Sequence, residues 1–193
     1  MSIFKEGFIK KGLLKPMKLI RDLAISNDYI SGIEIFFVYF LLLVVYAFAQ
    51  FKFFKGIFVL QDTYMFYFSS VKSETENFRL INFVISNFSS LALKLIVEII
   101  LIYFLVWLLN RKKYSISFAI TSVTVPFLIP IYIILLGVIF SFLPIHMFVL
   151  KLSEIAYLIS LYETTQKTYG ITKEKSLVVT LGTVFLVTLF FHP

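Results

Sequence analysis

Long uninterrupted runs of apolar side chains constrain this chain more than any other feature of its sequence. The stretch Ala92 to Leu109, ALKLIVEIILIYFLVWLL, is one example, and comparable runs follow one another along most of the 193 residues. A helix crosses a hydrocarbon core about 30 Å thick with roughly 20 apolar residues. With 60% hydrophobic and 15% charged residues, the chain lies outside the range of soluble globular domains. We therefore predict an integral membrane protein.

The apolar runs divide the chain into two parts. We predict a cytoplasmic amphipathic basic segment at 1–30 and a transmembrane domain at 31–193. The predicted fold class is all-α, a polytopic membrane helix bundle with five transmembrane helices at about 32–54, 87–109, 115–142, 145–168 and 172–191. Pro144 and Gly170, which favour helix ends, separate the last three spans as tight hairpins. The loop at 55–86 contains an aromatic stretch, which we expect at the interface on the outer side of the membrane.

The placement of Lys and Arg predicts the orientation. Basic residues cluster before the first span, after the second and after the fourth, whereas the turn after the third has no charge. Because short cytoplasmic loops are enriched in Lys and Arg, the N-terminus is expected in the cytoplasm and the C-terminus outside. The residues expected to contact the membrane surface or a partner are Lys10, Lys11, Lys15, Lys18, Arg21, Arg111, Lys112 and Lys113.

Two local signals concern the first segment and the start of the first span. The amphipathic pattern before residue 24, in which Pro16 can begin a helix, favours attachment to anionic lipid. The alternative is a basic tail that only sets the topology. Ser31 and Glu34 have the spacing of a capping box, so we expect Ser31 to cap the first span and Glu34 to have a local structural role.

Two pairs of oppositely charged residues lie inside the second and fourth predicted spans. Lys94 and Glu98 are four residues apart in the second span, and Lys151 and Glu154 are three apart in the fourth, so each pair shares one helix face. Charges at such depth usually face the bundle interior. We predict that the second and fourth spans adjoin and that these four residues form one buried polar cluster. It carries a proton or ion, binds a headgroup, or only neutralises itself and sets the helix register.

Pro126 and Pro130 interrupt the third span. They remove the usual donors to the carbonyls of Ser122 and Pro126, so neighbouring groups must satisfy these carbonyls. A helix broken in this way lines a binding cavity in some transporters, whereas in other membrane proteins the prolines only kink a packed helix.

Signatures of enzymes and cofactors are missing from the sequence. The chain has no cysteine, and its two histidines, His146 and His192, form no metal-ligand motif. We expect His146 to be interfacial. No nucleotide-binding or hydrolase motif is present, so we predict a non-enzymatic protein without metal or cofactor. We also expect no nucleic acid partner, because the spans leave no folded domain to bind one.

Three stretches resemble the Yip family, the Ypt-interacting membrane proteins. KGLLKPMKLIRDLAISNDYISGI resembles the segment that precedes the first span of that family. KKYSISFAITSVTVPFLIPIYIILLGVIFSFLP is similar to its third span, with a basic loop, a serine and a central proline. ISLYETTQKTYGITKEKSLVV is similar to the turn between its fourth and fifth spans. The resemblance covers most of the chain apart from residues 55–85 and implies five spans with a cytoplasmic N-terminus.

The family resemblance also implies a function. Its eukaryotic members are associated with vesicle trafficking and small GTPases, but they have a long cytoplasmic N-terminal domain that this chain lacks. We therefore expect a prokaryotic cytoplasmic membrane, and a Yip-like protein that organises membrane or partner proteins. The alternative is a small transporter or channel, or a subunit of a transporter, that uses the Lys/Glu cluster. The partners that we expect for the chain are the lipid bilayer and either another membrane protein or a second copy of the chain. Gly137 and Ser141 offer a small-residue helix contact to a second copy.

Overall fold

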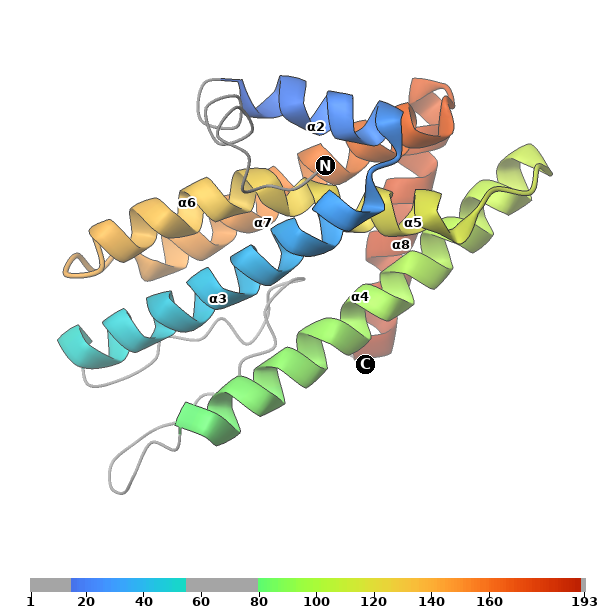
Figure 1. The fold of residues 1–193 in the computed structure, drawn as a ribbon. Coiled ribbons are helices and arrows are strands. Elements are labelled where there is room, and N and C mark those ends of the chain that lie inside the picture. The colour runs from blue at the N-terminus through green and yellow to red at the C-terminus, as the bar shows by residue number, and fades with distance from the viewer. Residues whose placement is uncertain (1–14, 55–79, 192–193) are drawn as a thin grey trace.

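The computed structural model describes residues 15–54 and 80–191. All regular secondary structure in these residues is helical. The helices are α2 (Pro16–Ser26), α3 (Tyr29–Phe54), α4 (Leu80–Asn110), α5 (Ile116–Thr124), the 3-10 turn η1 (Val125–Phe127), α6 (Leu128–Ile139), α7 (His146–Tyr169) and α8 (Lys173–Phe191) (Figure 1). The predicted contacts of Lys10 and Lys11, the predicted outer aromatic loop up to residue 79 and His192 lie outside the described residues.

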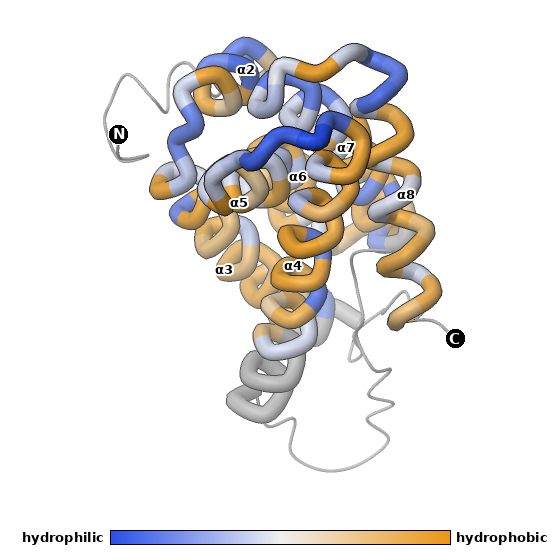
Figure 2. Tube along the Cα trace, turned by 90° about the vertical axis from the view of Figure 1, so that its right-hand side faces the viewer, coloured by the Kyte–Doolittle hydropathy of each residue, from blue (hydrophilic) through white to orange (hydrophobic). Residues whose placement is uncertain are grey.

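Four stretches of helix are long and apolar enough to cross a membrane. They are Tyr29–Gln50, Phe88–Asn110, Ile116–Ile139 and Lys173–Phe191. Figure 2 shows their apolar residues along the length of the bundle, with hydrophilic residues concentrated at α2 and at the connection between α4 and α5. The chain is thus an all-helical bundle with the helices of an integral membrane protein. α4 begins at Leu80 rather than at the predicted residue 87, because no proline or glycine interrupts the sequence LINFVIS before it.

α7 is long enough to cross a membrane but is not among these four stretches, and it has the central position in the bundle. It packs against α2, α5, η1, α6 and α8. Its polar side chains point inward, where Ser153, Glu154, Ser160 and Thr164 are buried. The exposed face consists mainly of apolar side chains spaced three or four residues apart, namely Phe148, Leu152, Ile155 and Ile159, and it also includes Lys151. This arrangement is the reverse of a soluble amphipathic helix, which turns its polar face outward.

α2 lies across one end of the bundle (Figure 1). Its apolar residues Leu19, Ile20 and Leu23 are buried in the core that includes residues of α7. Arg21 forms an ion pair with Glu163 of α7. The bundle therefore covers the apolar face of α2, and the attachment of this basic segment to anionic lipid stays a prediction.

A tight turn joins α2 to α3. Asn27 ends α2 in the left-handed conformation, with φ 51°, which asparagine tolerates better than most residues. The Asp28 carboxylate then accepts hydrogen bonds from the Ser31 N–H at 3.1 Å and from the Ser31 hydroxyl at 2.9 Å. Asp28, and not Ser31 as predicted, is thus the capping residue. Ser31 lies inside α3 because the helix begins at Tyr29, two residues before it.

Two glycines allow close helix packing. A methyl group at Gly32 of α3 would overlap Thr124 Oγ1 at the end of α5. At Gly137 of α6 it would lie 2.7 Å from Val149 Cγ1 of α7 and 3.1 Å from Tyr46 Cε2 of α3. Gly137 therefore makes a contact within the bundle. The expectation that Gly137 offers a contact to a second chain is wrong, because this position is already occupied by its own neighbours.

Candidate functional site

Charged side chains from two helices meet inside the bundle. Lys94 and Glu98 lie one turn apart on α4, and each is only 4% exposed. Glu154 of α7 is 8% exposed, and it interacts electrostatically with Lys94. The structure thus brings together three of the four charged residues that the sequence assigns to one polar cluster. We call Lys94, Glu98, Glu154 and the neighbouring Tyr157 the buried charge cluster.

At this cluster, α4 and α7 are linked by side-chain contacts and not by close packing of the two helices. The helix neighbours of α4 are α5 and α8. Tyr157 Oη of α7 donates a hydrogen bond of 2.6 Å to Glu98 Oε2, a length typical of a bond to an ionised carboxylate. Lys94 Nζ lies 6.0 Å from the ring centre of Phe191, at the end of α8. The two helices predicted to adjoin are therefore linked through long polar side chains across the core.

Lys151 lies at the edge of the buried charge cluster. Its side chain is 50% exposed, and its Nζ donates a hydrogen bond of 3.4 Å to Glu154 Oε2. Phe148, three residues before it, and Ile155, four residues after it, are also exposed, so Lys151 lies on the outward face of α7. The interior consequently holds one lysine for two glutamates, and not the equal numbers that the sequence predicts.

Sequence reasoning missed two tyrosines of this region. Tyr157 lies three residues after Glu154, so the helical spacing that paired the charged residues could have identified it. Tyr39 of α3 is fully buried and interacts with Ser153 and Glu154. No spacing rule connects Tyr39 with Ser153 and Glu154, because Tyr39 is distant from both in the chain. Only the packing of α3 in the bundle brings Tyr39 to them.

The proline break of the third predicted span lies next to the cluster. α5 and α6 are joined by the 3-10 turn Val125–Phe127, in which an amide bonds to the carbonyl three residues before it. Pro126 lies in this turn and has no amide N–H to donate. The Tyr157 hydroxyl lies 3.3 Å from this carbonyl oxygen and can donate to it. A side chain of α7 therefore contacts the broken helix at Val123, and the satisfaction of the Ser122 and Pro126 carbonyls stays a prediction.

A small pocket opens onto the same charges. It is lined by Leu91, Lys94, Leu95 and Glu98 of α4 and by Phe127 of η1. Three of these five side chains are apolar, and Lys94 and Glu98 add one cation and one carboxylate to the lining. Among the described residues, no group of three or more His, Cys, Asp or Glu side chains could hold a metal ion.

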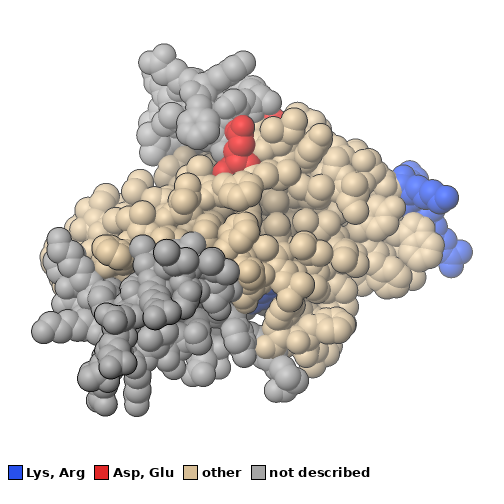
Figure 3. All heavy atoms as spheres, turned by 60° about the horizontal axis from the view of Figure 1, so that its bottom comes forward, with Lys and Arg blue, Asp and Glu red and all other residues tan. Residues whose placement is uncertain are grey.

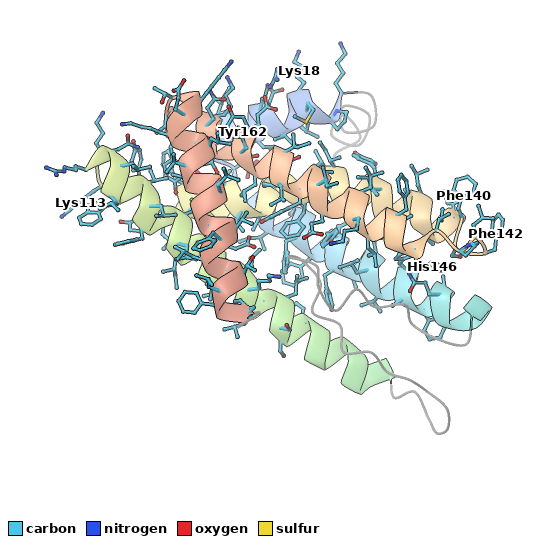
Figure 4. The ribbon with its side chains drawn as sticks, turned by 180° about the vertical axis from the view of Figure 1, so that it is seen from behind. Lys18, Lys113, Phe140, Phe142, His146 and Tyr162 are labelled. Carbon is cyan, nitrogen blue, oxygen red and sulfur yellow. The ribbon has the colours of Figure 1, made fainter. Side chains whose placement is uncertain are left out.

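His146 begins α7 at the other end of that helix from Glu163. It is 4% exposed, and its Nδ1 lies 3.2 Å from the hydroxyl of Tyr46 in α3. The sequence predicts His146 at the membrane interface, whereas the structure shows its imidazole buried against α3, because the α6–α7 turn directs the side chain inward. Phe140 and Phe142 of the same turn are instead the exposed aromatic residues of this end (Figure 4).

Basic side chains gather at the end of the molecule opposite that turn. Figure 4 shows Lys18 and Lys113 projecting from this end, and Figure 3 shows Lys and Arg collected beside an otherwise mostly uncharged face. The described residues predicted to contact a membrane surface or a partner are exposed, namely Lys15, Lys18, Arg21, Arg111, Lys112 and Lys113. Lys167 and Lys173 at the α7–α8 turn are also exposed. We call these eight residues the basic end.

Side-chain hydrogen bonds hold the segments of the basic end in place. Asn27, between α2 and α3, donates to Ser117 Oγ at 2.9 Å and accepts from Thr121 Oγ1 at 2.9 Å, both in α5. Lys175 Nζ of α8 donates to Asn110 Oδ1 at 2.8 Å, at the end of α4. These bonds join the start of α3 to α5, and α8 to α4. The basic end is therefore built from three separate parts of the chain, and these bonds lie beside all three of them.

The fold and the charge distribution together define a helical integral membrane protein with a polar interior and one basic end. Comparisons of the chain with protein-family models, with curated proteins and with solved structures return no match.

Proposed function

We propose that the chain is a five-span, non-enzymatic, Yip-like protein of a prokaryotic cytoplasmic membrane, and that it organises membrane or partner proteins. The observation that carries this proposal is the basic end, where three segments distant in sequence present Lys and Arg together. A surface of this kind is attracted to anionic headgroups and to acidic protein segments.

The inverted polarity of α7 supports its assignment as a membrane span, the fourth in chain order and the one that brings the number of spans to five. Its apolar face, with Phe148, Leu152, Ile155 and Ile159, is exposed while its polar side chains are buried. Lipid would cover such a face, whereas water would cover a polar one. The described segments with basic residues then lie on one side of the membrane, and the α6–α7 turn, with Phe140 and Phe142, lies on the other. This distribution agrees with a cytoplasmic N-terminus.

Affinity purification from the native host in mild detergent, followed by mass spectrometry, tests the organising role. We expect a stoichiometric partner to remain bound to the wild type. It should be lost from an Arg111→Gln, Lys112→Gln, Lys113→Gln variant, because the contact depends on charge. A Lys112→Arg, Lys113→Arg variant retains the charge and is the matched control. A Glu98→Gln, Glu154→Gln variant should keep the partner, since these residues lie inside the bundle. Purification of the wild type alone would contradict the proposal.

A small transporter, or a subunit of one, is the second candidate, and the buried charge cluster favours it. Ionisable residues inside membrane bundles commonly mark ion or proton pathways. Buried hydroxyl groups of Ser160, Thr165 and Thr168 in α7 and of Thr180 and Thr183 in α8 have no hydrogen-bond partner among the described protein atoms. They extend the polar interior from the buried charge cluster along α7 towards its C-terminal end.

Ion flux into liposomes containing the purified protein tests this second role. A pH-sensitive dye inside the liposomes would report proton entry after a pH step, and parallel assays would use Na⁺ and K⁺. Flux that Glu98→Gln abolishes, and that the basic-end variant leaves unchanged, would favour the transporter over the organising protein. Flux equal to that of empty liposomes for all three ions would remove the transporter as a candidate.

A further inference from the structure

Tyr157 connects a buried carboxylate to the proline break of a neighbouring helix. We propose that Glu98 is a proton-binding site, and that Tyr157 transmits its protonation state to the α5–α6 break at Val123. The ligand of this site is a single proton. The proposal goes beyond the organising role and does not depend on it.

The hydrogen bonds of Tyr157 have two arrangements. The hydroxyl has one proton and lies 2.6 Å from Glu98 Oε2 and 3.3 Å from the Val123 carbonyl oxygen. When Glu98 is ionised, it can only accept, so Tyr157 donates to it. When Glu98 takes a proton from water, its own O–H can donate to Tyr157 Oη. The phenolic proton is then released to turn towards Val123 O.

This exchange changes the environment of the broken helix. With Glu98 ionised, Tyr157 donates to Glu98, and its contact with the Val123 carbonyl oxygen is the longer of the two, at 3.3 Å. With Glu98 protonated, the same carbonyl gains a full hydrogen bond. Because this hydrogen bond is made to a residue directly before the turn Val125–Phe127, its formation favours a different geometry of the turn between α5 and α6. The 2.6 Å distance from Tyr157 Oη to Glu98 Oε2 is within the range of a hydrogen bond to a carboxylate.

The net charge of the residues around Glu98 favours the binding of a proton. Lys94 contributes one positive charge, and Glu98 and Glu154 contribute two negative charges, so these three buried residues together carry one negative charge. Tyr39 of α3 and Tyr157 of α7 are neutral. Val123 of α5, Phe127 of η1 and Phe191 of α8 also lie at this cluster, and their side chains do not titrate. Half-exposed Lys151 offsets Glu154 from the edge.

Glu98 is better placed than Glu154 to hold the proton. Glu154 has a second cation, Lys151, with Nζ at 3.4 Å. Glu98 lies deeper beside apolar Leu95 and Phe127, and it has a hydroxyl partner that can both donate and accept. Burial among apolar groups favours the neutral form of a carboxyl group, and a neighbouring cation favours the charged form. We therefore assign the proton site to Glu98 rather than to Glu154.

Infrared difference spectroscopy of the purified full-length protein in liposomes tests the proton site. Spectra recorded between about pH 4 and about pH 9 should contain the C=O stretch of a protonated carboxyl group that disappears at high pH. We expect Glu98→Gln to lose this band and Glu154→Gln to retain it. Tyr157→Phe should retain the band at a shifted frequency, because the carboxyl group then lacks the phenol. A band that survives in Glu98→Gln, or no titrating band in the wild type, would overturn the assignment.

Spin labels across the proline break test the coupling. The chain contains no cysteine, so Ile116→Cys in α5 and Ile139→Cys in α6, which are 57% and 58% exposed, accept labels selectively. The label-to-label distance should change with pH in the wild-type background. Tyr157→Phe should make the distance independent of pH while the infrared band still titrates, a result that a purely structural Tyr157 would not produce.

Two results would overturn the coupling. One is a distance that does not depend on pH in the wild-type background, and the other is a pH-dependent distance that persists in Tyr157→Phe. Tyr157→Phe keeps the ring that lies 4.6 Å from the ring of Phe127, so the test does not depend on a variant that removes core packing.

Discussion

Lys94 illustrates at the residue scale how a charge is kept inside an apolar bundle. Its side chain is 4% exposed, yet it interacts with Glu98 and Glu154 and lies near the ring of Phe191. A buried charge without partners is strongly destabilising, whereas a well-surrounded pair is close to neutral. The contribution of Lys94 to the stability of the fold therefore depends on the presence of both glutamates.

Lys94→Met should reduce the free energy of unfolding by about 3 kcal/mol, because two buried carboxylates lose their common cation. Thermal denaturation in detergent would measure the loss as a lower Tm. Adding Glu98→Gln to Lys94→Met should recover part of it. Lys151→Met is the matched control, and we expect less than about 1 kcal/mol there because half of that side chain is exposed. Equal effects of Lys94→Met and Lys151→Met would contradict the prediction.

Gly32 gives a second prediction at this scale. Its absent side chain allows α3 to approach Thr124 and Val125 of the broken helix. Gly32→Ala should destabilise the bundle by about 1–3 kcal/mol through overpacking. Gly182→Ala in α8 serves as comparison, since its methyl group would lie 3.3 Å from only the mobile end of Leu105. Chemical unfolding in detergent would compare the two, and a neutral Gly32→Ala would show that the helices separate easily.

At the scale of the element, the polarity of a helix follows from its position in the bundle. α7 turns buried Ser153, Glu154 and Thr164 inward and exposed Phe148 and Ile159 outward. α2 at the basic end has the opposite pattern, with buried Leu19 and Leu23 and exposed Lys18 and Arg21. The apolar face of α7 suits lipid and the polar face of α2 suits water, which agrees with the proposed membrane arrangement.

The cap of α3 gives an element-scale prediction with a defined pH dependence. Partial burial alone would raise the pKa of Asp28, but the hydrogen bonds from the Ser31 N–H and hydroxyl outweigh it and lower the pKa below 3.8. Because the folded pKa is depressed, this stabilisation is present above the unfolded pKa. It is lost as the pH falls through the folded pKa.

Asp28→Ala should therefore lower stability by about 1 kcal/mol at neutral pH, the usual effect of losing a cap. Asp28→Asn retains a capping oxygen without a titrating charge and is the control. The difference in Tm between wild type and Asp28→Asn should shrink as the pH falls below the ordinary aspartate value of 3.8. A difference that is constant with pH would mean that the charge of Asp28 does not contribute.

At the scale of the whole molecule, the five-span arrangement predicts which ends label from which side. Single cysteines replacing Lys113, Phe142 or Lys167 lie at exposed positions of a cysteine-free chain. In spheroplasts, a membrane-impermeant maleimide should label Phe142→Cys at once. It should label Lys113→Cys and Lys167→Cys only after permeabilisation. If α7 lay on the membrane surface instead, Phe142→Cys and Lys167→Cys would label from the same side.

The sequence by itself determined the class of protein and most of the helix positions. Apolar runs of sufficient length form helices in a membrane because the backbone must satisfy its own hydrogen bonds there. Hence α3, α7 and α8 begin and end within a few residues of the predicted bounds. Local spacing also placed Lys94 with Glu98 and Lys151 with Glu154, because residues three or four apart share a helix face.

Only the tertiary structure decided which of these residues act together. Helix spacing does not define the rotation of a helix against its neighbours, and this rotation turned Lys151 outward and Glu154 inward. Contacts between distant segments brought Tyr157 to Glu98 and Val123, and covered the apolar face of α2. Such contacts depend on the packing of whole helices, so no local pattern in the chain predicts them.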